Sequence, residues 1–107
     1  MELLPIPDVA EALDTDVLHV HRLIKEGELV DVRNADGVRC VPGEFVQDGA
    51  PVKSLRSVIQ LLRDARFSNE EIVSWLYQDD ATIPGTPIAA LRANRGTEVK
   101  RRAQAER

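Results

Sequence analysis

The segment Asp16–Glu26, DVLHVHRLIKE, is the most informative part of the chain. Its apolar residues Val20, Leu23 and Ile24 recur at spacings of three and four, which predicts a helix with one buried stripe. Its first residue is a favourable N-cap, and Gly27 supplies the left-handed residue that commonly ends a helix. We therefore expect a short helix that packs with one side and leaves the other side free.

The residues before this helix predict a second, shorter helix. The segment 3–13, LLPIPDVAEAL, has a helical apolar stripe. This stripe comprises Ile6, Val9, Ala10 and Leu13. Proline is tolerated in the first turn of a helix, so Pro5 and Pro7 mark the entrance. Only Asp14 and Thr15 remain as a link, and two helices joined so tightly form a helix-turn-helix.

A β-hairpin signal follows the central helix. The segment 28–42, ELVDVRNADGVRCVP, places the turn residues Asn34–Gly37 between two runs rich in valine. Asp-Gly flanked by β-branched residues favours a tight reversal between antiparallel strands, and Pro42 ends the second strand. Two short strands are not stable alone, so we expect them to pack on the preceding helices as a wing.

These elements together resemble the winged helix-turn-helix of the MerR and excisionase type. The matching residues are Leu4, Val9, Ala10, Leu13, Asp16, Val20, Arg22, Leu23, Ile24, Gly27 and Leu29. One departure is Asp14, where related proteins usually have glycine in the turn. Over its whole length the chain is also similar to a small actinobacterial family of winged-helix DNA-binding proteins with a C-terminal helical module. The resemblance implies that double-stranded DNA is the partner and Asp16–Glu26 the recognition helix.

The expected DNA contacts follow from this assignment. They comprise Val17, Leu18, His19, His21, Arg22 and Lys25 on the helix, and Arg33 and Arg39 on the wing. Arg22 and His21 offer hydrogen bonds to base edges or phosphates, Lys25 a phosphate contact, and Leu18 an apolar contact to a thymine methyl. An arginine at position 22 has an alternative role, contacting the DNA backbone or an acidic residue of the same protein.

The second half of the chain predicts further helices. Residues 43–53 are expected to form a connector without chemistry, which Phe45 and Val46 anchor to the core. Ser54 is expected to cap a helix over 54–67, and Ser68 with Glu71 forms a capping box at the start of a helix over 68–80. Thr86 and Pro87 begin a short helix to Leu91, and a final helix covers 97–107. The fold class is mainly α, with a winged helix-turn-helix at 1–50 and a C-terminal helical module at 51–107.

Charge is distributed unevenly along the chain, whose net charge is −4. Residues 1–50 contain 11 acidic and 4 basic residues, a net charge of −7, and residues 51–107 contain 7 and 10, a net charge of +3. Phosphate attraction usually supplies much of the affinity for DNA, so the basic side chains of the first half must cluster. The C-terminal Lys100, Arg101 and Arg102 are candidates for secondary phosphate contacts.

Several other classes of protein find little support. The single cysteine, Cys40, excludes an internal disulfide, and His19 and His21 are two residues apart, which is unlike the spacing of metal ligands on a helix. No catalytic or phosphate-binding motif is present, so we expect neither an enzyme nor a cofactor. No segment reaches the roughly 20 apolar residues of a membrane span, and we expect a soluble, cytoplasmic, nucleoid-associated protein.

The sequence thus predicts a small transcriptional regulator that inserts the 16–26 helix into the major groove. The chain lacks the sustained heptads of the coiled coil through which MerR regulators dimerise, so dimerisation or a protein partner would have to strengthen binding by other means. The alternative hypothesis is a protein-interaction module that uses the same scaffold without DNA, which the acidic first half would permit.

Overall fold

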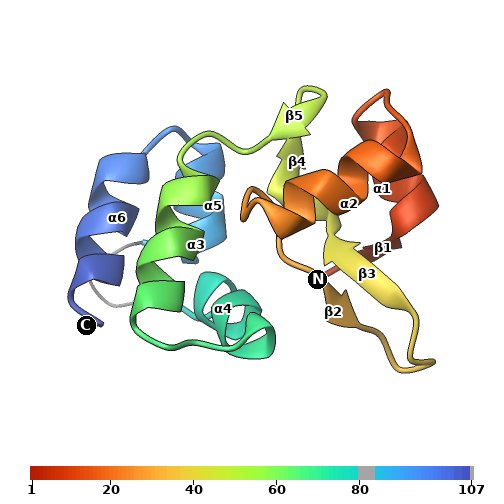
Figure 1. Cartoon of the computed structure of the whole chain (residues 1–107). Helices are drawn as coiled ribbons and strands as arrows, with labels where there is room; N and C mark the ends of the chain where they lie inside the picture. Colours follow the sequence, from red (N-terminus) through yellow and green to blue (C-terminus); the bar gives the residue numbers. More distant parts are fainter. Residues whose placement is uncertain (80–83, 107) are drawn as a thin grey trace.

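The computed structural model describes residues 1–79 and 84–106, and Figure 1 shows their elements in two groups joined by a short linking segment. The first group comprises β1 (Leu3–Pro5), α1 (Ile6–Ala12), α2 (Val17–Lys25), β2 (Val32–Arg33) and β3 (Arg39–Pro42). The linking segment comprises a 3-10 turn η1 (Gly43–Phe45), β4 (Val46–Gln47) and β5 (Ala50–Pro51). The second group comprises α3 (Leu55–Asp64), α4 (Asn69–Leu76), α5 (Pro87–Arg92) and α6 (Gly96–Gln104). The mainly α fold with a small wing is therefore confirmed.

The prediction of a helix over Asp16–Glu26 is confirmed at both ends. Helix α2 has Asp16 as its N-cap, whose side chain accepts a hydrogen bond of 2.8 Å from the backbone amide of His19. Gly27 follows the helix with a φ of 80°. In the turn before α2, Asp14 has a φ of 54°, so an aspartate adopts the left-handed conformation for which glycine is usual.

The prediction of a helix over 3–13 is wrong for its first three residues. Leu3–Pro5 is a strand that pairs antiparallel with β3 and makes the wing a three-stranded sheet, with β3 between β1 and β2. Pro5 has an extended backbone with a ψ of 157°, and α1 begins only after it. The partner strand lies far along the sequence, so local periodicity carried no sign of this pairing.

The linking segment contains a second hairpin, which the prediction of a plain connector over 43–53 did not include. Strands β4 and β5 pair antiparallel, and Asp48 and Gly49 connect them with φ values of 54° and 76°. Two consecutive residues with positive φ make the tight reversal typical of a two-residue hairpin loop. The prediction that Phe45 anchors this segment to the core is confirmed, because its side chain is completely buried.

Helix α3 begins after Ser54, but Ser54 does not cap it, and that prediction is wrong. Its backbone has a φ of 71°, and its side chain makes no capping hydrogen bond. The side chain instead faces Gly96 at the start of α6, where a Cβ atom would lie 2.6 Å from the hydroxyl oxygen of Ser54.

Thr86 caps α5 as expected. Residues 80 and 107, at the ends of two predicted helices, lie outside the described residues.

The capping box at α4 is confirmed and makes stability depend on pH. Ser68 accepts from the amide of Glu71, and the Glu71 carboxylate accepts from the amide of Ser68. Hydrogen bonding of this carboxylate, first to the backbone amide of Ser68 and then to its side chain, holds the pKa of Glu71 below its ordinary value of 4.5.

A carboxyl group with a lowered pKa in the folded state contributes stability above its ordinary pKa and loses it on acidification. We therefore expect the wild type to be more stable than Glu71→Gln above about pH 5 and this advantage to disappear towards pH 3. Urea unfolding at a series of pH values measures the difference. A constant difference between the two proteins across that range would contradict the expectation.

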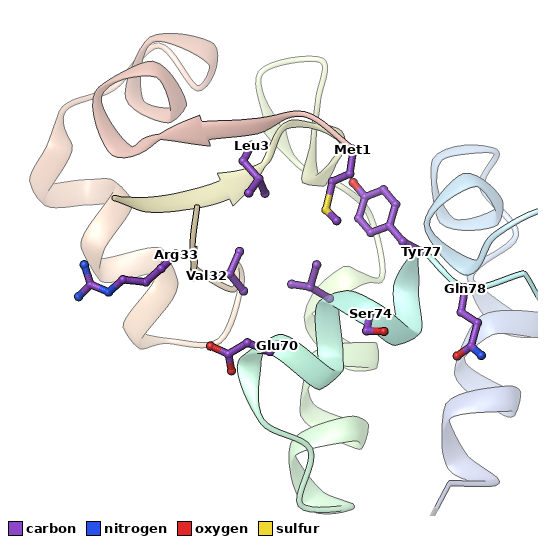
Figure 2. A pocket seen from close by; sticks show the side chains of 9 residues that line it. Met1, Leu3, Val32, Arg33, Glu70, Ser74, Tyr77 and Gln78 are labelled. Atoms are coloured by element: carbon purple, nitrogen blue, oxygen red, sulfur yellow. The ribbon is translucent and has the colours of Figure 1, made fainter. Parts of the chain in front are cut away.

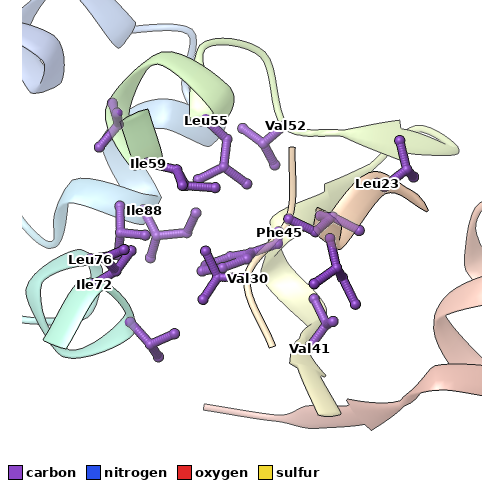
Figure 3. Close-up of a cluster of buried hydrophobic side chains, with 14 of the residues drawn as sticks. Leu23, Val30, Val41, Phe45, Val52, Leu55, Ile59, Ile72, Leu76 and Ile88 are labelled. Carbon is purple, nitrogen blue, oxygen red and sulfur yellow. The ribbon is translucent and has the colours of Figure 1, made fainter. Parts of the chain in front are cut away.

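One continuous core joins the two groups of elements. Figure 3 shows buried side chains of the first group, such as Leu23 and Val41, on one side of Phe45 and those of the helices, such as Ile59 and Leu76, on the other. The ring of Phe45 stacks on that of Tyr77, with centroids 6.4 Å apart. The winged part and the C-terminal helices therefore share their apolar interior.

Among the described residues, no helix is both long enough and apolar enough to cross a membrane.

Candidate nucleic-acid interface

The side of α2 that faces away from the core carries a row of exposed side chains. Leu18, Arg22 and Lys25 follow one another at spacings of four and three, so they share one side of the helix. Leu18 is 77% exposed, a large value for a leucine in a folded domain. On the opposite side, Val20, Leu23 and Ile24 are buried. The helix thus presents two cations and an apolar side chain to the outside.

The other predicted helix contacts lie on the two flanks of this row. Val17, 39% exposed, and the half-buried His21 lie on one flank, and His21 contacts Arg39 of the wing. His19 is half-buried on the other flank, where it lines a groove of about 520 Å³ with residues of the β4–β5 hairpin, including Gly49 and Ala50. The two histidines therefore point in different directions, as their spacing predicts.

Hydrogen bonds within the wing turn close it. The side-chain oxygen of Asn34 accepts from the backbone amides of Asp36 and Val38, each at 2.9 Å. The guanidinium of Arg33 donates to the carbonyl of Gly37 at 2.9 Å across the turn. Arg33 remains exposed with a defined orientation, and the exposed Asp36 sits at the same tip.

Arg39 is not a free cation of the wing. Its Nε donates to Asp31 at 2.5 Å, and its Nη1 lies 3.3 Å from Nδ1 of His21 on α2. Asp31 also receives hydrogen bonds from the side chain of Asn69, the first residue of α4. Arg39 therefore does not lie away from the acidic residues of the first half, as the prediction of a basic cluster required. No local pattern marks Asp31 or Asn69 as partners, because they lie 38 positions apart in the sequence.

A groove of about 600 Å³ separates the wing from α4. Figure 2 shows Leu3 and Val32 of the sheet on one side and Glu70, Ser74 and Tyr77 of the helical group on the other. Burial, and then the nearby Glu44 carboxylate, raise the pKa of Tyr77, so its hydroxyl stays protonated. The groove shows that wing and helix are not closely packed along this boundary.

The basic C-terminal residues lie far from α2. Helix α6, which carries Lys100, Arg101 and Arg102, packs on α3 and α5 at the opposite end of the molecule from α1 (Figure 1). In the part of the chain that the structure describes, no group of three or more His, Cys, Asp or Glu residues could hold a metal ion.

Comparison with known proteins assigns the chain to a family. Residues 1–46 match the family described as "DNA-binding protein Rv2175c, wHTH domain", and residues 52–106 match "Rv2175c C-terminal domain of unknown function". The protein named "DNA-binding protein Rv2175c" from Mycobacterium tuberculosis is 37% identical over 112 residues, which cover 94% of this chain and 77% of the relative. The chain belongs to the Rv2175c family. This family membership confirms the winged-helix assignment.

The solved structure titled "NMR structure of Rv2175c" agrees with the fold. It superimposes with a TM-score of 0.87 at 34% sequence identity, and the match covers 97% of this chain and 80% of that one. Within the Rv2175c family, the relative's name refers to DNA binding, whereas the description of the C-terminal domain gives no function.

Proposed function

We propose that this chain binds double-stranded DNA, with α2 in the major groove and the β2–β3 hairpin against the neighbouring backbone. The observation that carries the proposal is the outward row Leu18, Arg22 and Lys25 on a helix whose opposite side is buried. The major groove admits an α-helix, whose arginine, lysine and apolar side chains can contact base edges or phosphates there. The name of the Mycobacterium tuberculosis relative supports the same partner.

The roles of individual residues follow from their positions. Arg22 contacts base edges or phosphate, Lys25 contacts phosphate, and Leu18 meets a thymine methyl, with Val17, His19 and His21 on the flanks. Arg33, at the wing tip, contacts the backbone or the minor groove. The side chains of Lys100, Arg101 and Arg102 would reach phosphate only on DNA that extends or bends to the far end of the molecule.

The test is a salt-dependent titration of fluorescent duplex DNA. We expect Arg22→Ala/Lys25→Ala to weaken binding about tenfold at low salt, because both cations face the duplex. The slope of log affinity against log salt should fall by about one for each phosphate that is no longer neutralised. Fluorescence anisotropy at two salt concentrations, with and without unlabelled competitor of unrelated sequence, measures affinity, slope and sequence preference together.

A charge-matched control separates the recognition helix from general electrostatics. Arg56→Ala/Arg63→Ala removes two exposed cations from α3, and it should bind DNA nearly as well as the wild type. Equal losses in the two double variants would reject a specific role for α2. If Arg22→Ala/Lys25→Ala bound DNA with wild-type affinity, this would indicate that the C-terminal basic residues contact the DNA instead.

At a finer level, we propose a small regulator of transcription that acts at the nucleoid, without catalytic activity or a cofactor. Residues 1–50 would contact DNA and residues 51–107 would complete the fold. The resemblance to the MerR and excisionase type remains a prediction. So few cations give a modest affinity for DNA. A homodimer or a protein partner would raise this affinity.

A protein-interaction module without DNA remains the second candidate. The observation in its favour is the net charge of −7 over residues 1–50, together with the exposed apolar Leu18. If the wild type binds no duplex even at low salt while a stable protein partner is isolated with it, this second function replaces the first.

A further inference from the structure

A chain of polar contacts runs from the C-terminal helices to the recognition helix. Asn69 at the start of α4 donates to the backbone and side-chain oxygens of Asp31, at 3.1 and 3.3 Å. Asp31 accepts from Nε of Arg39 on β3 at 2.5 Å. Nη1 of Arg39 lies 3.3 Å from Nδ1 of His21 on α2. Four separate parts of the fold are thus linked in series.

The chemistry of these groups determines which ring nitrogen of His21 carries the proton. The guanidinium of Arg39 is always protonated and can only donate, so Nδ1 of His21 must be the acceptor. The neutral imidazole then carries its proton on Nε2, which becomes the donor available to a ligand. The position of Arg39 therefore determines both the orientation of the ring and the atom with which it donates.

At the boundary between the wing and α4, Asp31 receives its hydrogen bonds from Asn69. The Asp31 side chain is only 17% exposed, so water would not fully replace the hydrogen bonds from Asn69 if they were removed. Val32 and Glu70, the neighbours of Asp31 and Asn69 in sequence, line the groove of about 600 Å³ between wing and α4. The Asn69–Asp31 contact thus lies at the edge of a loosely packed boundary, where a polar link can set the position of the wing strand.

We propose that Asn69, Asp31 and Arg39 are positioning residues, through which the C-terminal helices hold His21 in place for contact with DNA. This inference rests on the proposed function. It gives a role to a region that matches a domain described as having unknown function. Arg39 accordingly acts mainly through His21 and not as an independent phosphate contact.

The variant Asn69→Asp tests the proposal with little change in size. It replaces donors by a carboxylate facing Asp31, while an acidic residue in the first turn of α4 suits the helix dipole. We expect DNA binding to be about three- to tenfold weaker than in the wild type, a loss within the range of coupling between groups in contact. In a His21→Ala background the same substitution should have no further effect, and Gln60→Ala, which removes another side-chain amide of the helical module, should bind as the wild type does.

A second measurement needs no DNA. Long-range proton–nitrogen NMR spectra at a pH where histidine is neutral distinguish the two tautomers of the ring. We expect His21 to carry its proton on Nε2 in the wild type and to become a mixture of tautomers in Asn69→Asp, whereas His19 should be unchanged. Thermal unfolding tests whether Asn69→Asp is folded. If Asn69→Asp is unfolded, Asn69→Ala is used instead in both measurements.

The outcomes separate this inference from the proposed function. If the wild type binds DNA but Asn69→Asp keeps its affinity and its His21 tautomer, the positioning role is rejected. An equal loss of affinity with and without His21 also rejects it, because the effect would not pass through the imidazole. If the wild type binds no DNA, the proposed function fails, and an unchanged His21 tautomer would then overturn the positioning chain as well.

Discussion

Replacing Phe45 with alanine is expected to destabilise the whole molecule by about 3–5 kcal/mol, the usual cost of truncating a buried phenylalanine. Phe45 is completely buried, stacks on Tyr77, and lies between the apolar residues of the winged part and those of the helices (Figure 3). The truncation leaves a cavity where the two groups of elements meet. The destabilisation corresponds to a fall in melting temperature of roughly 15–30 °C for a domain of this size.

Phe67 provides a matched control for this substitution. It is only half-buried at the edge of the core, so Phe67→Ala should cost about 1–2 kcal/mol. Urea unfolding followed by the fluorescence of Trp75 and by circular dichroism gives the free energy of unfolding of each variant. Equal costs at the two positions would show that Phe45 does not join the two parts, and separate transitions would show that they unfold independently.

Replacing Gly96 with alanine is expected to cost about 2–3 kcal/mol, although alanine normally favours a helix. A Cβ atom at Gly96 would lie 2.6 Å from the hydroxyl oxygen and 2.7 Å from the Cβ of Ser54. Helices α3 and α6 would have to move apart there. Rotation of the Ser54 side chain can move its hydroxyl oxygen but not its Cβ, so it cannot relieve the whole overlap.

The same geometry predicts a rescue. Ser54 has a φ of 71°, which glycine adopts without strain, so Ser54→Gly alone should stabilise the protein by about 0.5–1 kcal/mol. In Ser54→Gly/Gly96→Ala the crowding atoms are gone, and stability should return to within about 0.5 kcal/mol of the wild type. Thermal and urea unfolding of the wild type, the two single variants and the double variant give the four free energies of this double-mutant cycle. Additive effects of the two substitutions would contradict the close contact between α3 and α6.

Local signals are sufficient to predict helix α2 and the wing turn. Asp16 and Gly27 mark the ends of α2, and Asn34 with Gly37 closes the wing turn, because in each case the deciding hydrogen bonds or dihedral angles involve neighbours in sequence. The outward row of α2 also follows from periodicity alone. DNA contact by the individual residues of this row stays a prediction.

Other features depend on partners that are distant in sequence. Leu3–Pro5 form a strand only because β3 is available to pair with them, and Ser54 faces Gly96 instead of capping α3. The polar chain that ends at His21 depends on Asp31 and Asn69 in the same way. The β4–β5 hairpin is different, because Asp48-Gly49 is a recognised turn signal that the glycine- and proline-rich context obscured.

The buried Cys40 can be used to measure local opening of the wing sheet. It lies at the centre of β3, paired with Pro5 on one side and Val32 on the other, and its thiol has no exposed surface. A thiol reagent can reach it only when the packing around it opens, so the rate of modification measures local opening of the structure around β3. Because Cys40 is the sole cysteine, the wild-type chain reports on the wing without any engineered label.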